Sequence, residues 1–320
     1  MTTGQVRWGF LGAGFVASLA LAPAVRAAKN AQLQVVAARD LQRAQELEPN
    51  SCVTSYREVC EADDVDIIYL SLPNGDHLEW VVAALRAGKD VVCEKPLGLS
   101  AADVATMTAV AESTGRMLVE AAWNRWHPRT QRISELVGER TGAREVTAAF
   151  TFNGVPEGNY RLDPANGGGA LYDVGCYAIA AALAVIGADV TVTEANASFG
   201  PTGVDLTTSA VLTSTLGSAH VLASFEQPES QVLRVAAPDF LLEVPHPAFT
   251  SWREESMLRV VAEGSDRSEA FPECDAYQLM VEAVSSRHGG DDAWVLPLSS
   301  SWETARVLDQ IRERTAPASH

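Results

Sequence analysis

The chain has 320 residues, of which 47% are hydrophobic and 20% are charged, the composition of a globular protein. Because a single hydrophobic core stops growing near about 250–300 residues, this length predicts two domains. The formal net charge of −17 argues against nucleic acid and anionic membranes as partners, since both are negatively charged. It does not argue against an anionic cofactor, because backbone N–H groups can build a local phosphate site.

The sequence indicates neither a leader nor a metal site. No apolar stretch reaches the roughly 20 residues that span a bilayer, and the N-terminus lacks a basic region followed by an apolar segment. The five cysteines contain no Cys-x-x-Cys pair, which is typical of reduced thiols, and the histidines show no metal-ligand spacing. We therefore expect a cytoplasmic protein that binds no metal.

Strand and helix signals alternate over the first 120 or so residues. Strands are expected at 6–12, 33–38, 66–73, 90–96 and 117–122, and helices at 15–30, 76–88 and 100–115, with a short polar helix after the second strand. Strands that are apolar along their whole length and alternate with helices predict a parallel sheet covered on both faces.

The pattern changes after about residue 142 to strands joined by short turns. Strands are expected at 143–153, 189–199, 204–215, 218–226, 232–245 and 257–264, and helices at 170–186, 275–290 and 301–314. The predicted fold class is α/β. A doubly wound parallel-sheet domain at 1–123 is followed by an α+β domain at 124–320 with a large, mainly antiparallel sheet.

The first strand turns into the first helix through "GAGFVA" at 12–17, a Gly-x-Gly-x-x-Ala pattern. Gly12 permits the tight turn and Gly14 lets the backbone approach a pyrophosphate. Lying between a strand and a helix at the start of the chain, the pattern predicts a Rossmann-type dinucleotide site formed by Gly12, Gly14, Phe15 and Val16. A purely structural glycine turn is the alternative.

The end of the second strand bears on which dinucleotide is bound. An NAD site has an acidic residue here that holds the ribose 2′-hydroxyl, but this chain reads "VVAARD", with Arg39 first and Asp40 after it. A guanidinium suits a 2′-phosphate through charge-assisted bonds, which favours NADP(H). Asp40 could instead serve NAD(H), or cap the following short helix.

Lys95 follows the strand at 90–96 in the segment "CEKP". Ligands of open parallel sheets bind beyond the carboxyl ends of the strands, so this lysine is expected to face the ligand. Its alternative is a solvated lysine in an ordinary turn.

A glycine-rich stretch, "GGGALYDVGCY" at 167–177, precedes the apolar helix. Three consecutive glycines indicate backbone that bends sharply or approaches something closely. Asp173 and Tyr177 lie four residues apart, so both side chains leave the same face of the helix. The pair could be catalytic, or it could be an ordinary hydrogen bond at a helix start.

Together these motifs resemble the glucose–fructose oxidoreductase/inositol dehydrogenase (Gfo/Idh/MocA) family of NAD(P)-dependent oxidoreductases. The resemblance covers nearly the whole chain and is carried by "GFLGAGFVA", "PNGDH", "CEKPL", "EAAWNRWHP" and "GGGALYDVGCYAI". It implies that Lys95, Asp173 and Tyr177 converge around a transferred hydride. It also implies that the turns carrying Pro73, Asn74, His77 and Glu94 contact the cofactor.

Tyr177 departs from one branch of this family, because dehydrogenases of the inositol type have histidine there. "NYRLDPANGGGALYDVGCY" is similar to the subgroup of NADP-linked aldose (D-xylose) dehydrogenases, dihydrodiol dehydrogenases and nucleotide-sugar ketoreductases. A tyrosine, with an ordinary pKa near 10, needs a nearby cation to transfer protons near neutral pH, and Lys95 is the candidate.

The remaining candidates concern substrate and assembly. Arg125 is expected to clamp the cofactor, Arg161 the substrate, and Trp126 to line the face of a sugar. The resemblance implies hydride transfer between nicotinamide and a carbinol or carbonyl carbon of a pyranose or similar polyol. A ketoreductase for a nucleotide-linked keto-sugar is the alternative, and a non-catalytic sensor would have a broken Lys–Asp–Tyr set. Apolar residues on both faces of the second sheet predict a homodimer or homotetramer.

Overall fold

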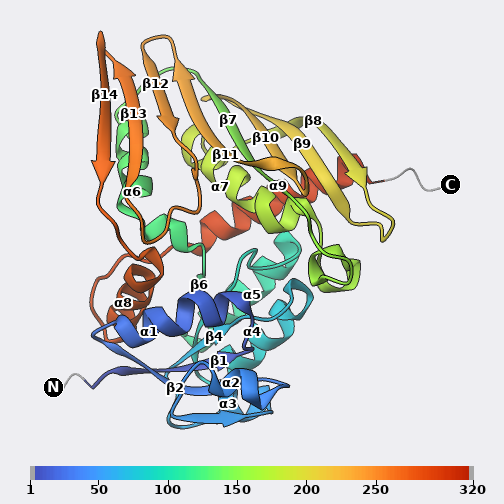
Figure 1. The fold of residues 1–320 in the computed structure, drawn as a ribbon, viewed down its shortest axis with the longest axis vertical. Coiled ribbons are helices and arrows are strands. Elements are labelled where there is room, and N and C mark those ends of the chain that lie inside the picture. The colour runs from blue at the N-terminus through green and yellow to red at the C-terminus, as the bar shows by residue number, and fades with distance from the viewer. Residues whose placement is uncertain (1–3, 317–320) are drawn as a thin grey trace. The chain divides into compact units, whose positions relative to one another are not determined.

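Residues 4–316 are described by the structure, a computed structural model (Figure 1). They form two compact units. The first contains residues 4–98, 102–126 and 275–301, and the second contains 99–101, 127–274 and 302–316. The chain thus returns to the first unit at residue 275, whereas a single boundary after residue 123 is what the sequence suggests.

The first unit is built on a six-stranded, wholly parallel sheet of order β3-β2-β1-β4-β5-β6. This doubly wound order confirms the predicted fold class. Its strands are β1 Val6–Leu11, β2 Ala31–Ala37, β3 Ser51–Val53, β4 Ile67–Leu70, β5 Asp90–Cys93 and β6 Leu118–Glu120. Its helices are α1 Ala22–Ala27, α2 Leu41–Gln45, α3 Tyr56–Glu61, α4 His77–Arg86, α5 Ala101–Thr114 and α8 Ala276–His288, with 3-10 turns at Asn74–Asp76 and Trp123–Trp126.

Two local features differ from expectation. The predicted helix over 15–30 is α-helical at 15–16, is wound as a π-helix over Ala17–Leu21 and is α-helical again over Ala22–Ala27, with Pro23 in the first turn of this last segment. Proline has no N–H to continue the regular bonding, so the winding changes just before it. The strand β3 and helix α3 were not anticipated, because elements of three and six residues carry too little periodicity to stand out.

Helix α8 is fastened to the parallel sheet by polar side chains. Trp8 on β1 donates its Nε1–H to Ser285 Oγ (3.0 Å), and His288 Nδ1 lies 2.7 Å from Asp90 Oδ2 at the start of β5. The hydrogen bond with Asp90 raises the pKa of His288. These long-range bonds explain why a segment so late in the chain completes the first unit.

The second unit is built on an eight-stranded sheet of order β14-β13-β12-β11-β7-β10-β9-β8. Its strands are β7 Arg144–Asn153, β8 Thr191–Phe199, β9 Asp205–Ser214, β10 Gly217–Ser224, β11 Glu226–Ala237, β12 Phe240–Val244, β13 Ser256–Ala262 and β14 Ser265–Phe271. Neighbouring strands are antiparallel except β7 and β10. Its helices are α6 Pro128–Gly138, α7 Cys176–Ile186 and α9 Leu298–Thr315.

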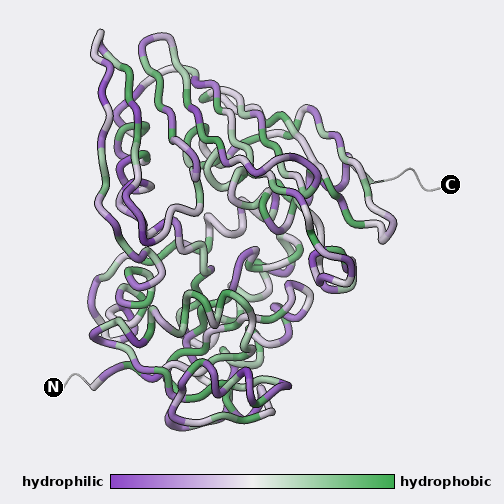
Figure 2. The backbone as a smooth tube through the Cα atoms, in the orientation of Figure 1, coloured by the Kyte–Doolittle hydropathy of each residue, from purple (hydrophilic) through white to green (hydrophobic). Residues whose placement is uncertain are grey.

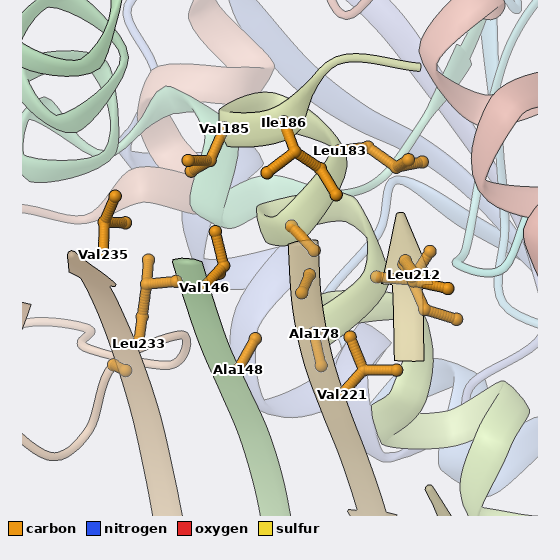
Figure 3. Close-up of a cluster of buried hydrophobic side chains, with 14 of the residues drawn as sticks. Val146, Ala148, Ala178, Leu183, Val185, Ile186, Leu212, Val221, Leu233 and Val235 are labelled. Atoms are coloured by element: carbon orange, nitrogen blue, oxygen red, sulfur yellow. The ribbon is translucent and has the colours of Figure 1, made fainter. Parts of the chain in front are cut away.

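One face of this sheet carries the core. Side chains of α7 such as Ala178, Leu183 and Ile186 pack over Val146, Ala148, Leu212, Val221, Leu233 and Val235 from the strands (Figure 3). Along α7 the chain is almost entirely hydrophobic, whereas the edge strand β14 is mostly hydrophilic (Figure 2). The helical stretch Pro164–Ile186 is long and apolar enough to cross a membrane, contrary to expectation, but 72% of its apolar window is buried inside the unit.

The sequence patterns did not predict several elements of the second unit correctly. Helix α6 follows His127, whose Nδ1 caps it by accepting a hydrogen bond from Arg129 N (3.0 Å), and no prediction covered it. The stretch 232–245 turns at 238–239 and forms parts of two strands, β11 and β12. Strand β14, "SDRSEAF", lacks apolar alternation because it is an exposed edge strand. Helix α9 begins at Leu298, three residues before the predicted start at 301.

The opposite face of the eight-stranded sheet has a hollow of about 410 Å³. Register places one row of outward residues across four strands, from Glu194 through Val211 and His220 to Thr147. The next row contains Asn196, Ser209, Leu222 and Ala149. Apolar side chains such as Val211 and Leu222 thus lie among polar ones such as Glu194 and His220 in a hollow on the face that α7 does not cover.

Candidate functional site

The glycine turn after β1 packs against the turn after β4. Gly12 has φ of +98°, and its N–H donates to Ala37 O (2.8 Å). A Cβ on Gly12 would collide with the carbonyl oxygen of Ser71, and one on Gly14 would lie 3.0 Å from Ser71 Oγ. Phe15 is 75% exposed and Val16 is half-buried. The glycine turn is therefore tightly packed against the turn after β4, and the helix that follows it begins with an exposed Phe15 side chain.

The segment after β2 carries two arginines, Arg39 and Arg43, with Asp40 between them. Arg39 is exposed, and Asp40 caps α2 by accepting hydrogen bonds from Gln42 N (2.9 Å) and Arg43 N (3.4 Å). Arg43 donates to Ala13 O in the glycine turn (2.6 Å). The alternative role of Asp40 as a helix cap is thus confirmed. The sequence analysis did not predict a role for Arg43. Its position four residues after Arg39, in the first turn of the next helix, could have indicated one.

His77 joins the turns that follow β4 and β5. It is fully buried, with Nδ1 3.0 Å from Pro96 O and Nε2 3.2 Å from Leu72 O, and burial lowers its pKa. Because no atom of His77 is exposed, its side chain cannot make the predicted contact with a cofactor in this structure. The ring instead fixes the segment carrying the half-buried Pro73 and Asn74.

Lys95 lies at the end of β5 beside two buried carboxylates. Glu94 accepts hydrogen bonds from Tyr69 Oη (2.7 Å) and Lys95 N (3.3 Å), and Glu120 accepts one from Leu97 N (3.0 Å). Burial raises the pKa of both Glu94 and Glu120, and the charge of Lys95 opposes that rise in each. Glu94 therefore braces the lysine turn from beneath rather than facing outward.

Arg125 and Trp126 occupy the 3-10 turn after β6. Burial lowers the pKa of Arg125, while the charge of Glu120 opposes that shift. Trp126 is only 4% exposed and meets Trp294 edge-on at a ring distance of 5.1 Å. Within the first unit Trp126 thus packs as a core residue, and Arg125 belongs to the charge cluster around Lys95.

In the second unit the three glycines allow two close approaches. Gly168 N donates to Asp163 O (3.0 Å) and Gly169 N to Arg161 O (2.9 Å). A Cβ on Gly168 would lie 2.5 Å from the Arg161 carbonyl oxygen, and one on Gly169 would collide with Asp205 Oδ1. The glycines therefore let the preceding loop and a carboxylate of β9 pack against the start of the helix.

These approaches assemble a polar group on the helix. Arg161 Nε donates to Asp173 Oδ2 at 2.7 Å, in a π-helical segment at Leu171–Gly175. Tyr177, half-buried one turn later, lies between the rings of Phe150 (5.7 Å) and Phe249 (6.3 Å). Of the predicted site residues, the structure brings Arg161 to Asp173 and keeps Tyr177 beside them.

The predicted site residues therefore form two groups, one in each unit. Most of those in the first unit lie at the carboxyl ends of parallel strands or in the turns that follow, where open α/β sheets bind ligands. Among residues 4–316, no three histidines, cysteines or carboxylates cluster as a metal site.

Comparison with protein families matches both parts of the chain. Residues 6–122 match the family model of the oxidoreductase family with an NAD-binding Rossmann fold, GFO_IDH_MocA. Residues 142–237 match the GFO/IDH/MocA C-terminal domain.

Similar proteins extend over nearly the whole chain. A D-xylose 1-dehydrogenase (NADP⁺) of Haloferax volcanii is 35% identical over 315 residues, 96% of each chain. The trans-1,2-dihydrobenzene-1,2-diol dehydrogenase of Mus musculus is 29% identical, again over 96% of each chain. The crystal structure of a 3-ketoreductase from Actinomadura kijaniata, in complex with NADP and TDP-benzene, covers 98% of each chain with a TM-score of 0.91 and 26% identity.

The glycine geometry predicts a specific effect of substitution. Gly168→Ala should destabilise the protein by about 1–3 kcal/mol, because its Cβ would press on the Arg161 carbonyl. Gly138→Ala at the end of α6 is the matched control, since nothing lies within 4 Å of its Cβ. Urea unfolding measures both. Equal midpoints for the two variants would show that the approach at Gly168 is not needed.

Proposed function

Since this chain belongs to the Gfo/Idh/MocA family of oxidoreductases, we propose that it transfers a hydride between NADP(H) and a carbinol or carbonyl carbon of a pyranose or similar polyol. The observation that carries this proposal is the position of Tyr177 one helical turn after Asp173, which is ion-paired with Arg161. Three glycines come directly before this helix. A non-catalytic sensor is disfavoured because Lys95, Asp173 and Tyr177 are all present.

The residues of the first unit suit a dinucleotide. The backbone at Gly12, where a Cβ would collide with the Ser71 carbonyl, and at Gly14 would hold the pyrophosphate, with Phe15 and Val16 opening the helix behind it. Arg39 would pair with a 2′-phosphate, and Asp40 is engaged in capping α2. The rest of the dinucleotide would contact Pro73, Asn74 and Arg125. When bound, the nicotinamide supplies or accepts the hydride.

The chain's own residues would manage the proton. We assign Tyr177 as the group that gives its hydroxyl proton to a substrate oxygen during reduction and takes it back during oxidation. Lys95 would supply positive charge that favours the ionised tyrosine and the developing oxyanion. Glu94 and Glu120, buried beneath the lysine turn, would hold Lys95 in place.

Two substrate classes are supported to different degrees. The full-length likeness to a D-xylose dehydrogenase supports a free aldose, and the dihydrodiol dehydrogenases support a related ring diol. The structural likeness to a 3-ketoreductase that binds TDP-benzene supports a nucleotide-linked keto-sugar as the second candidate. Oxidation of aldoses and ring diols, measured beside reduction of nucleotide-linked keto-sugars with both cofactors, distinguishes them.

Compartment and assembly complete the proposal. The five cysteines are free thiols, which supports the cytoplasm as the site of action. The hollowed face of the eight-stranded sheet, with apolar Val211 and Leu222 facing outward, supports a homodimer or homotetramer that packs through this face.

Cofactor preference is tested at Arg39. Arg39→Ala should weaken NADPH binding roughly 10- to 100-fold and leave NADH binding nearly unchanged, because only NADPH carries the 2′-phosphate. Arg57→Ala, an exposed arginine on α3, is the control. Arg43→Ala should weaken both cofactors, since Arg43 supports the glycine turn. Fluorescence titration measures the affinities, and equal losses for both cofactors in Arg39→Ala would refute the assignment.

Proton transfer is tested at Tyr177 with the substrate found in the survey above. Tyr177→Phe should lower kcat by about 10²- to 10⁴-fold with cofactor affinity unchanged, and Lys95→Ala should lower it at least as much. The double variant should lose little more than either single one, because the residues act as a unit. Tyr172→Phe on the same helix is the control: it loses a hydrogen bond to Leu99 O (2.6 Å) and should retain turnover. Normal turnover in Tyr177→Phe would exclude this role.

Assembly is tested by light scattering at micromolar concentration. The wild-type chain should have the mass of a dimer or tetramer, and Leu222→Glu should dissociate it by placing a charge on the hollowed face. Leu216→Glu at the β9–β10 turn, where the side chain is already 43% exposed, should leave the mass unchanged. A stable wild-type monomer would contradict the proposal.

A further inference from the structure

The Arg161–Asp173 ion pair lies one helical turn before Tyr177, the tyrosine on which the proposed function rests. Its atoms lie 2.7 Å apart, and the side chains are 30% and 13% exposed. The close approach of the loop at Gly168 and Gly169 brings the backbone of Arg161 to the helix, so the pair is part of the fold and not a chance surface contact. An ion pair held by the backbone in this way keeps its geometry at little further entropic cost.

Charge and aromatic groups surround Tyr177 within the second unit. Asp173 lies one turn earlier on the same helix, and Arg161 reaches in from the 3-10 turn Tyr160–Leu162. From β7 and from the segment before β13, the groups against the ring are the apolar Phe150 and Phe249. Burial lowers the pKa of Arg161, but Asp173, Tyr160 and Tyr177 outweigh it and raise that pKa, so Arg161 stays cationic.

An unpaired carboxylate one helical turn from Tyr177 would disfavour the tyrosinate, because like charges repel strongly where water is partly excluded. A guanidinium bonded to that carboxylate cancels most of its field. We propose that Arg161 is a positioning residue that holds and neutralises Asp173, so that Tyr177 can ionise for proton transfer. This inference rests on the proposed function only in giving that ionisation a purpose.

The proposal revises two roles that the sequence suggested. The sequence predicts that Arg161 clamps the substrate and that Asp173 is catalytic. In the structure the two side chains engage each other. Their charges act on Tyr177 with opposite signs, and this opposition is the property that an experiment can resolve.

The experiment titrates the tyrosine directly. Tyrosinate absorbs at longer ultraviolet wavelength than tyrosine, and subtracting the titration of Tyr177→Phe from that of the wild-type chain isolates Tyr177 among the six tyrosines. The midpoint of that difference curve is compared among Arg161→Gln, Asp173→Asn, the double variant and Arg161→Lys. For each variant the matching Tyr177→Phe background is subtracted.

The expected shifts have opposite signs. Arg161→Gln should raise the midpoint by about one pH unit, because it removes the cation that is bonded to Asp173. Asp173→Asn should lower it by a similar amount, because it leaves the cation alone. The double variant should return close to wild type, and Arg161→Lys should restore most of the normal value.

An unchanged midpoint in folded Arg161→Gln overturns the inference. So does a result in which both single variants shift the midpoint in the same direction and the double variant shows the sum of the two shifts. If Arg161→Gln does not fold, two other variants still test the inference. It predicts a lower midpoint for Asp173→Asn and a nearly normal midpoint for Arg161→Lys. The titration needs no substrate. Failure of the proposed function would appear separately, as normal turnover in Tyr177→Phe, while the midpoints would still test the ion pair.

Discussion

The polar arrangement of the second unit depends on close backbone approach at Gly168 and Gly169. A side chain at the first position would meet the Arg161 carbonyl, and one at the second would meet the Asp205 carboxylate. Because both positions lack a Cβ, the loop over residues 159–166 packs on the helix start. Arg161 then pairs with Asp173 in the π-helical segment. The glycines thus allow the close packing of the loop that places the Arg161 guanidinium beside the Asp173 carboxylate.

Asp205 shows the energetic side of the same constraint. Burial raises the pKa of this carboxyl, and hydrogen bonds from Thr208 Oγ1 (2.8 Å) and Leu171 N (2.8 Å) oppose that rise. A buried carboxylate is costly unless its lone pairs are occupied. Here it accepts a backbone N–H in the first turn of the helix, where such groups have no partner within the helix itself. The cost of burial is offset by satisfying the helix start that carries Asp173 and Tyr177.

The sequence predicts the parts of this molecule that repeat a strong pattern. Apolar strands and amphipathic or apolar helices identified both sheets, and the glycine pattern at Gly12 identified the turn between the first strand and the helix that follows it. Short or polar elements escaped, since β3 has three residues and β14 is an exposed edge strand. The return of α8 to the first unit depends on pairs such as Trp8 with Ser285, 277 residues apart, and no local pattern encodes such a bond.

The same limit applies to the site residues. Residue type and spacing singled out Asp173, Tyr177 and Lys95, but neither indicates what a side chain bonds to. His77 and Glu94 belong to motifs that predict cofactor contacts, whereas the structure buries both side chains. His77 is bonded to the turns after β4 and β5, and Glu94 is bonded to Tyr69 on β4. In each unit, buried polar groups fix the backbone from which less buried groups such as Lys95 and Tyr177 project. Support of this kind must be buried and fully bonded to be rigid, so a motif combines residues that hold the site with residues that act in it.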